Sequence, residues 1–254
     1  FIKKILDLFG FKITRKRLND NNVDLYVELS LKEKDIIRYI TNNNLSMSSL
    51  PRLINTVKSC VYVVENNIEG DFVECGVWRG GNSIAAKKIF ELLGSKKEVW
   101  LFDTFAGMTK PTEYDVDSIN HKNAMNRFNE LQRDDINDWC YASLEDVKAN
   151  FKDYDIDMSG VNFIKGDVLK TIDLGQRLPD KISVLRLDTD WYESTKRELE
   201  FLYPKISKKG VLVIDDYGGW QGSKKAVDEY FFNSKYKPLL NVIDYTGRSA
   251  IKPE

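Results

Sequence analysis

The chain has few of the residues that bind soft metals, and it has no long apolar run. Its 254 residues include one histidine and three cysteines (Cys60, Cys75 and Cys140), and the cysteines have no metal-type spacing. This composition argues against a zinc or iron–sulfur site. An odd number of cysteines favours a reducing compartment over a disulfide framework, so we expect a cytoplasmic protein. No apolar run approaches the ~20 residues of a membrane span, so we expect no stable membrane insertion.

Net charge is also nearly absent. Lys and Arg together number 38 and Asp and Glu 39, which gives a formal charge of −1 at pH 7. So balanced a charge creates no global field that would attract nucleic acid, and we expect no nucleic-acid partner. Hydrophobic residues make up 42% of the chain, enough for a substantial core. The length fits one large α/β domain or a domain with a helical extension.

The hydrophobic pattern changes near residue 69. Residues 1–68 are predicted to form an N-terminal helical extension, because segments 31–42 and 48–67 carry apolar residues at helical spacing. Residues 69–254 alternate short apolar strands with helices, one of them at 191–206, which predicts a Rossmann-like, mostly parallel sheet. The last two strand segments, 238–244 and 248–253, predict an antiparallel edge. Residues 104–140 are polar and irregular, and a connection of that length predicts a functional lid or a disordered segment.

The first predicted strand leads into a glycine-rich turn, DFVECGVWRGGNS, at residues 71–83. Glycines such as Gly76 allow a sharp turn and a close approach of the backbone to a ligand. The pattern is not GxGxxG and no lysine follows, which disfavours a nicotinamide dinucleotide or a nucleoside triphosphate. Glu74, at the strand tip, would repel a pyrophosphate and suits a cationic or amino-bearing ligand. An ordinary tight β–α turn is the alternative interpretation.

Two further acids end the next two predicted strands. Asp103 follows the glycine-rich turn at the distance where an acid commonly accepts hydrogen bonds from a ribose diol. Asp167, in FIKGDV, could receive an adenine amino group, although either acid could equally cap a helix. Three acids at successive strand tips fit a nucleoside without phosphates, and S-adenosylmethionine meets that description.

Four aspartates end two later hydrophobic runs. VLRLDTDWYES contains Asp188 and Asp190, and VLVIDDYGGW contains Asp215 and Asp216. Crowded carboxylates repel one another and lose solvation, so they need compensation. Magnesium prefers oxygen ligands, and Asp188 with the adjacent pair could supply three. A polar turn is the alternative for the pair.

Asp190 lies two residues beyond Asp188, and its natural role is that of a general base beside the cation. The alternative is that it caps the helix that follows. His121, in the long loop, could contact substrate but is equally well explained as exposed. The three tryptophans near the expected cleft suit a sugar or another ring, and core packing explains them nearly as well: Trp139, Trp191 and Trp220.

Six ordered blocks of the sequence resemble the macrocin and mycinamicin sugar O-methyltransferases, the TylF/MycF family. The blocks are SMSSLPRL, GDFVECGVWRGGNS, LFDTFAGM, FIKGDV, LRLDTDWYEST and VLVIDDYGGWQGSKKAVDEYF. The resemblance covers about residues 45–252 and implies a class I methyltransferase that uses S-adenosylmethionine and magnesium. By resemblance, Asp190 matches the general base. The implied magnesium ligands are Asp188, Asp215 and Asp216, and the implied cofactor contacts are Met47, Ser48, Glu74, Gly76, Asp103, Ser143 and Asp167.

The first 44 residues and the 109–140 loop depart from the family pattern. In the family these regions shape the acceptor pocket and the oligomer contacts, so the acceptor is not carried over, and a homo-oligomer is the expectation. The sequence thus predicts an O-methyltransferase that acts on a vicinal diol, of a sugar in an antibiotic, a surface polysaccharide or a nucleotide-linked precursor. The alternatives are a catechol-type O-methyltransferase, a nicotinamide-dependent oxidoreductase and a non-catalytic partner in glycan assembly.

Overall fold

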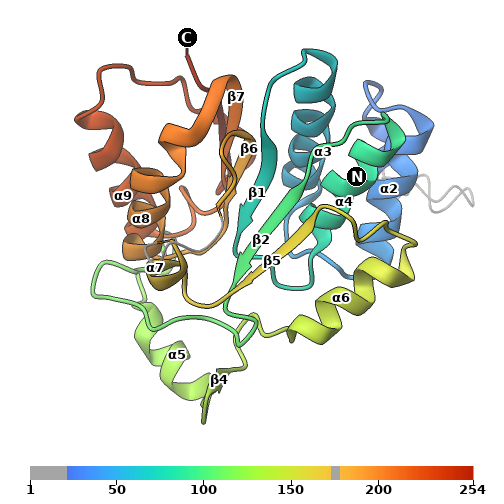
Figure 1. Cartoon of the computed structure of the whole chain (residues 1–254). Helices are drawn as coiled ribbons and strands as arrows, with labels where there is room; N and C mark the ends of the chain where they lie inside the picture. The colour runs from blue at the N-terminus through green and yellow to red at the C-terminus, as the bar shows by residue number, and fades with distance from the viewer. Residues whose placement is uncertain (1–21, 173–177, 254) are drawn as a thin grey trace, which may run out of the picture.

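The computed structural model describes residues 22–172 and 178–253, and within these ranges helices cover both faces of a seven-stranded sheet (Figure 1). The strand order is β5-β2-β1-β6-β7-β9-β8. The first five of these are mutually parallel, while β9 runs antiparallel to β7 and to β8. This confirms the predicted Rossmann-like sheet with an antiparallel edge. The strands are β1 (Asp71–Cys75), β2 (Val99–Asp103), β5 (Val161–Lys165), β6 (Ile182–Leu187), β7 (Ile206–Ile214), β8 (Asn241–Val242) and β9 (Arg248–Ile251).

Alternation along the strands creates a separate core on each face of the sheet. In β1, for example, Phe72 packs into one buried cluster and Val73 into the other. The first core is covered by α2 (Leu31–Asn42), α3 (Leu50–Glu65), α4 (Gly81–Leu92) and α6 (Leu144–Asp153). The second is covered by α7 (Val168–Thr171), α8 (Tyr192–Phe201) and α9 (Gln221–Phe232).

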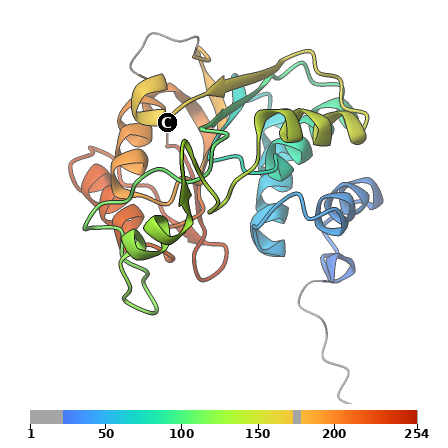
Figure 2. The same cartoon turned by 90° about the horizontal axis from the view of Figure 1, so that it is seen from below.

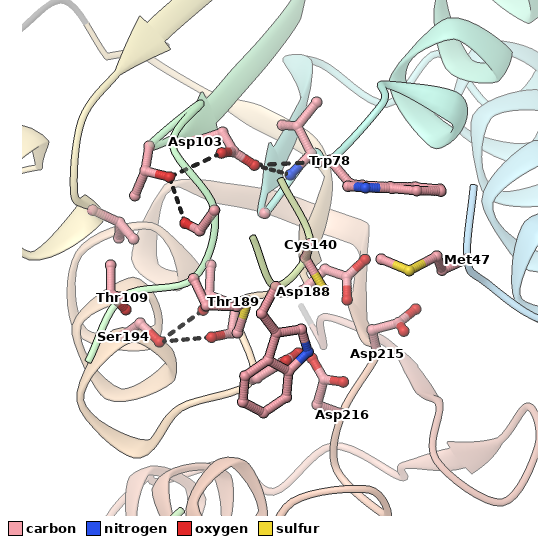
Figure 3. A pocket seen from close by; sticks show the side chains of 18 of the residues that line it. Met47, Trp78, Asp103, Thr109, Cys140, Asp188, Thr189, Ser194, Asp215 and Asp216 are labelled. Atoms are coloured by element: carbon pink, nitrogen blue, oxygen red, sulfur yellow. Dashed lines mark hydrogen bonds between the residues drawn. The ribbon is translucent and has the colours of Figure 1, made fainter. Parts of the chain in front are cut away.

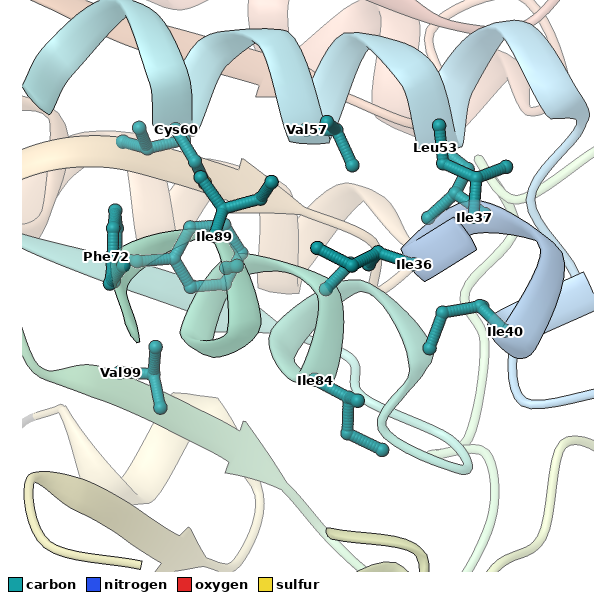
Figure 4. Packing of buried hydrophobic residues seen from close by; sticks show 14 of the residues in the cluster. Ile36, Ile37, Ile40, Leu53, Val57, Cys60, Phe72, Ile84, Ile89 and Val99 are labelled. Carbon is teal, nitrogen blue, oxygen red and sulfur yellow. The ribbon is translucent and has the colours of Figure 1, made fainter. Parts of the chain in front are cut away.

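The N-terminal helices share the first core with the sheet. Figure 4 shows side chains of α2 and α3, among them Ile37 and Val57, in one cluster with Ile84 of α4. All three are fully buried. Serines begin both helices: Ser30 caps α2 in a capping box, and Ser49 caps α3. A short 3-10 helix, η1 (Val23–Leu25), precedes α2. The amphipathic segment at residues 1–11 lies outside the described residues.

Two expectations about the secondary structure were wrong in detail. The helix predicted at 191–206 ends at Phe201 and gives way to a 3-10 turn, η2 (Tyr203–Lys205). Pro204 offers no amide hydrogen to a continuing helix, and Ile206 is already paired with Ile182 of β6. The 104–140 loop is not irregular throughout. It contains the helix α5 (Ala124–Leu131), capped by Asn123, and a small hairpin of β3 (Gln132–Arg133) and β4 (Ile136–Asn137).

The 104–140 loop is hydrogen-bonded to the starts of the helices that follow β6 and β7. Asp115 is fully buried and accepts hydrogen bonds from the amides of Thr112 (2.7 Å) and Tyr192 (2.8 Å). Asp117 forms a β-bridge with Trp220, just before α9. Figures 1 and 2 show this green segment below the sheet, on the side of α8 and α9. Among the described residues, no helix is both long and apolar enough to cross a membrane.

Candidate active site

A cavity of about 280 Å³ opens at the carboxyl ends of the parallel strands, under the 104–140 loop. This is the edge of an open α/β sheet at which ligands bind. The loop contributes Thr109, Arg127 and Trp139 to the cavity wall. Eight of the predicted site residues line the cavity: Met47, Ser48, Gly76, Asp103, Asp188, Asp190, Asp215 and Asp216.

Three carboxylates converge at one end of the cavity. Asp188 follows β6 and Asp215 and Asp216 follow β7, and the final residues of these neighbouring strands, Leu187 and Ile214, are in register. One oxygen of each aspartate lies within 4.8 Å of the others. Figure 3 shows these three side chains at one end of the cavity, with Asp103 at the other. The Oδ2 atom of Asp216 is buried and has no hydrogen-bond partner among the described residues.

Burial and mutual repulsion raise the pKa values of the acids at this end. Burial, followed by the charge of Asp188, raises the pKa of Asp190 to about 7. Burial also raises the pKa of Asp215 to about 7, although the nearby Arg186 lowers it. The pKa of Asp216 lies well above its usual value because of burial and the charges of Asp190, Asp188 and Asp215. A positive charge placed among them would relieve this repulsion.

Asp190 has a left-handed backbone conformation, with φ of 66°. The N-cap residue of α8 is Trp191, and the first free amide of that helix, on Tyr192, bonds Asp115 from the long loop. Asp190 is therefore not the cap of this helix. Its half-buried side chain lines the cavity beside the three acids.

A buried arginine, not predicted from the sequence, lies beneath the aspartates. Arg186 lies in β6 with no exposed surface, on the same face as Asp188 and in register with Glu74 of β1. Its guanidinium contacts the carboxylates of Glu74 (3.1 Å), Asp188 and Asp215, and it donates to Ser48 Oγ at 2.8 Å. A buried cation is stable only among such partners. The sequence feature that could have revealed Arg186 is its single charge inside the apolar run ISVLRL.

A second arginine reaches the same acids from α3. Arg52 donates to Asp215 Oδ2, and its Nε lies 3.0 Å from Asp244 Oδ2 in the turn between β8 and β9. Its side chain is 13% exposed and lines the cavity. Nothing in the sequence pattern distinguishes this arginine from an exposed helix residue, because its partners lie more than 160 residues away.

The other end of the cavity is formed by β1, β2 and the segment before α3. Asp103 accepts hydrogen bonds from the amides of Val77 (2.6 Å), Trp78 (3.2 Å) and Phe105 (2.7 Å), and burial raises its pKa. Gly76 has φ of 81°, and a Cβ there would lie 1.8 Å from the carbonyl oxygen of Asp188. Only glycine fits this close crossing of two chains.

Three predicted cofactor contacts do not line the cavity. Glu74 is 1% exposed and bonds Arg186 and Ser83, beneath the cavity floor. Ser143 caps α6, and Asp167 caps α7 by accepting from the amide of Leu169. The cofactor roles predicted for these three residues stay predictions.

Tryptophans lie in the cavity wall near the aspartates. The rings of Trp139 and Trp220 lie 5.9 Å apart and line the cavity, while Trp191 packs edge-on against both. The guanidinium of Arg127 lies 4.4 Å from the centre of the Trp139 ring. Such faces suit the apolar side of a sugar ring. His121 is exposed and does not line the cavity.

A model of the macrocin O-methyltransferase family (TylF) matches residues 20–249. The chain belongs to this family. The match begins upstream of residue 45, where the recognisable sequence blocks start. Demethyldecarbamoylnovobiocin O-methyltransferase of Streptomyces niveus is 37% identical over 210 residues, which cover 81% of this chain and 74% of the relative. Mycinamicin III 3″-O-methyltransferase of Micromonospora griseorubida is 32% identical over 190 residues, 73% of this chain and 69% of the relative.

Solved structures agree with this assignment. The O-methyltransferase NovP superposes with a TM-score of 0.76 at 27% identity, covering 92% of this chain and all of that one. The calicheamicin methyltransferase CalS11 has a TM-score of 0.60 at 16% identity, covering 91% of this chain and 96% of that one, and shows the shared fold alone. The family member described here is thus an O-methyltransferase with the class I methyltransferase fold.

Proposed function

We propose that this enzyme transfers a methyl group from S-adenosylmethionine to one hydroxyl of a vicinal diol on a sugar, with magnesium bound by Asp188, Asp215 and Asp216. The observation that carries the proposal is the convergence of these three acids and Asp190 in one cavity. The same cavity contains Asp103, Met47 and Ser48 at the positions predicted for the methyl donor.

The residues fit a hard divalent cation. The three acids offer only oxygen atoms, which magnesium prefers, and the buried Oδ2 of Asp216 lacks a partner among the described residues. No histidine or cysteine belongs to the described cluster that could hold a metal. Bound there, the cation would orient two adjacent hydroxyls and lower the pKa of one of them.

The protein groups then have separate tasks. Asp190 accepts the proton of the attacking hydroxyl, because it lines the cavity beside the three acids and does not cap the helix that follows. Asp103 and the backbone around Gly76 bind the donor, which supplies the methyl group. Trp139 and Trp220 hold the sugar ring and exclude water. Most of the acceleration in this scheme comes from orientation and electrostatics.

The sugar class rests on the relatives. Their names describe O-methylation of a novobiocin precursor, of a rhamnosyl tetracenomycin and of a mycinamicin. A catechol-type acceptor would use the same cation chemistry, and a panel of sugar and aromatic diols separates the two. The lid role of residues 104–140, the extension at 1–68, the homo-oligomeric state and the cytoplasmic location stay predictions.

Methyl transfer to a panel of nucleotide sugars and glycosides, followed by mass spectrometry with and without EDTA, tests the proposal. Asp188→Ala should abolish the cation-dependent activity, because it removes one of three ligands and leaves the cofactor end intact. Asp180→Ala is a matched control, since Asp180 is exposed and does not line the cavity. Full activity in excess chelator would exclude the metal role, and turnover of catechols alone would exclude the sugar.

A further inference from the structure

Both oxygens of Asp215 already have a cationic partner. Oδ1 is bonded by Arg186 and Oδ2 by Arg52, and the carboxylate is 4% exposed. A divalent cation held by Asp215 must therefore share one of these oxygens with a guanidinium group or displace that group. Two like charges on one carboxylate oxygen repel each other strongly in a buried site.

The two arginines differ in their freedom to move. Arg186 is fully buried and is also bonded to Glu74, Asp188 and Ser48, so releasing it would break contacts to three chain segments. Arg52 is 13% exposed and lines the cavity. It also has a second anionic partner, Asp244, which is no part of the aspartate cluster. Arg52 is therefore the arginine that can release Asp215 when a cation binds.

The contacts of Asp244 favour a lasting ion pair with the Arg52 guanidinium. Its Oδ1 accepts the amides of Thr246 (2.9 Å) and Gly247 (2.7 Å), while Oδ2 faces Arg52 and Ser49 Oγ. Burial raises its pKa, but the hydrogen bond from Ser49, the Gly247 amide and the charge of Arg52 outweigh it and lower the value to about 2. Asp244 is thus an anion at every physiological pH.

We propose that Arg52 is an exchangeable counter-ion of the cation site: it releases Asp215 when a divalent cation binds and stays paired with Asp244. This rests on the proposed function, since it requires cation binding at Asp215. It makes Arg52 a positioning residue, because the group acts on the cation through a shared carboxylate. Ser49 caps α3 one turn before Arg52, and Met47 and Ser48 directly precede it in the cavity wall. A movement of Arg52 at the cation site would therefore take place next to this segment.

Direct binding of Mn²⁺, measured by electron paramagnetic resonance of the free ion, tests the exchange without any turnover. Arg52→Gln removes a competing charge and frees Asp215 Oδ2, so its Kd should fall about tenfold. Arg52→Lys keeps the charge and should remain within about threefold of the wild type. Arg38→Gln, which removes an arginine from an ion pair on α2 far from the cavity, is the matched control and should bind as the wild type does.

Asp244→Asn should act in the opposite direction. The amide still accepts the turn hydrogen bonds but gives Arg52 no charge to retain, so Arg52 stays with Asp215 and Mn²⁺ binds about threefold more weakly. A Kd for Arg52→Gln that is equal to or weaker than that of the wild type, in a variant with an unchanged circular-dichroism spectrum, would overturn the exchange. If the wild-type protein itself binds no Mn²⁺, the proposed metal site fails first, and the two failures are distinguishable.

Discussion

On the β1 and β2 side of the cavity, Asp103 accepts three backbone amides, whereas on the β6 and β7 side Asp216 keeps a buried oxygen without a partner among the described residues. We call these the donor side and the cation side. On the donor side, Asp103 accepts backbone amides and Asp167 caps α7. Glu74 is bonded to Arg186 and Ser83. On the cation side, Asp188 and Asp215 are paired with arginines, whereas Asp190 and Asp216 lie among other carboxylates.

The difference separates carboxylates that maintain the fold from carboxylates that are available to a ligand. An acid whose oxygens are engaged by the protein contributes to stability, and removing its charge should cost folding free energy. An acid that is crowded by like charges is destabilising until a ligand compensates it, which is characteristic of a functional site. Isosteric Asp→Asn variants on the two sides should therefore have contrasting effects.

The largest effect is expected for Asp190→Asn on the cation side. If Asp190 is the base, as proposed, its loss should lower kcat by about 10²–10⁴-fold, while S-adenosylmethionine and Mn²⁺ binding persist. Asparagine tolerates the left-handed backbone at this position, so the fold is not strained by the change. Single-turnover kinetics with separate binding titrations provide the measurement. Turnover close to that of the wild type would remove Asp190 from the role of base.

A smaller effect, and on stability rather than on chemistry, is expected for Asp103→Asn on the donor side. Asparagine has one acceptor oxygen in place of two, so at least one of the three amide hydrogen bonds is lost, at a cost of about 1–3 kcal/mol in the free energy of unfolding. Urea denaturation without ligands provides the measurement. Asp167→Asn, which changes only a helix cap, should cost about 1 kcal/mol or less. If Asp103→Asn is as stable as the wild type, the contrast between the two sides fails.

Much of this arrangement could be predicted because strand tips are local features of the sequence. Asp188 and Asp215 each follow a hydrophobic run, and parallel neighbouring strands bring such tips together whatever the loops do. The capping box between Ser143 and Asp146 is a local feature of the same kind, since the two residues are three positions apart. The division into three ligands and one base was predicted from the residues themselves, and the resemblance to a known family implies the same division.

The parts that escaped prediction depend on contacts distant in the sequence. Arg52 meets Asp215 and Asp244 only because α3 packs beside the ends of β7 and β8. The first free amide of α8, on Tyr192, is bonded by Asp115 in the long loop, and local spacing in the sequence cannot reveal this contact. Helix α5 was not predicted, because only Ala124 of that helix is buried and the polar composition of the segment is that of an irregular loop.

The pH dependence of stability gives the smallest and subtlest test of the contrast. Glu198 of α8 lies beneath the cation side, fully buried, and accepts a hydrogen bond from Thr189 at 2.9 Å. Burial raises its pKa to about 8, and the pKa values of Asp190 and Asp215 are raised to about 7. In the unfolded chain these groups titrate near pH 4. Between these values the folded state binds more protons than the unfolded state.

In EDTA, the free energy of unfolding should therefore fall as the pH rises from about 5 to about 8, because the folded state must then release protons from buried acids. One such group accounts for at most about 1.4 kcal/mol per pH unit. Glu198→Gln should make the slope shallower by up to that amount, whereas Glu200→Gln, an exposed position on the same helix, should not. Urea denaturation at half-unit pH intervals gives the slopes. Stability that rises across this window would mean that these acids are ionised in the folded protein and that the cation side is compensated by its own arginines.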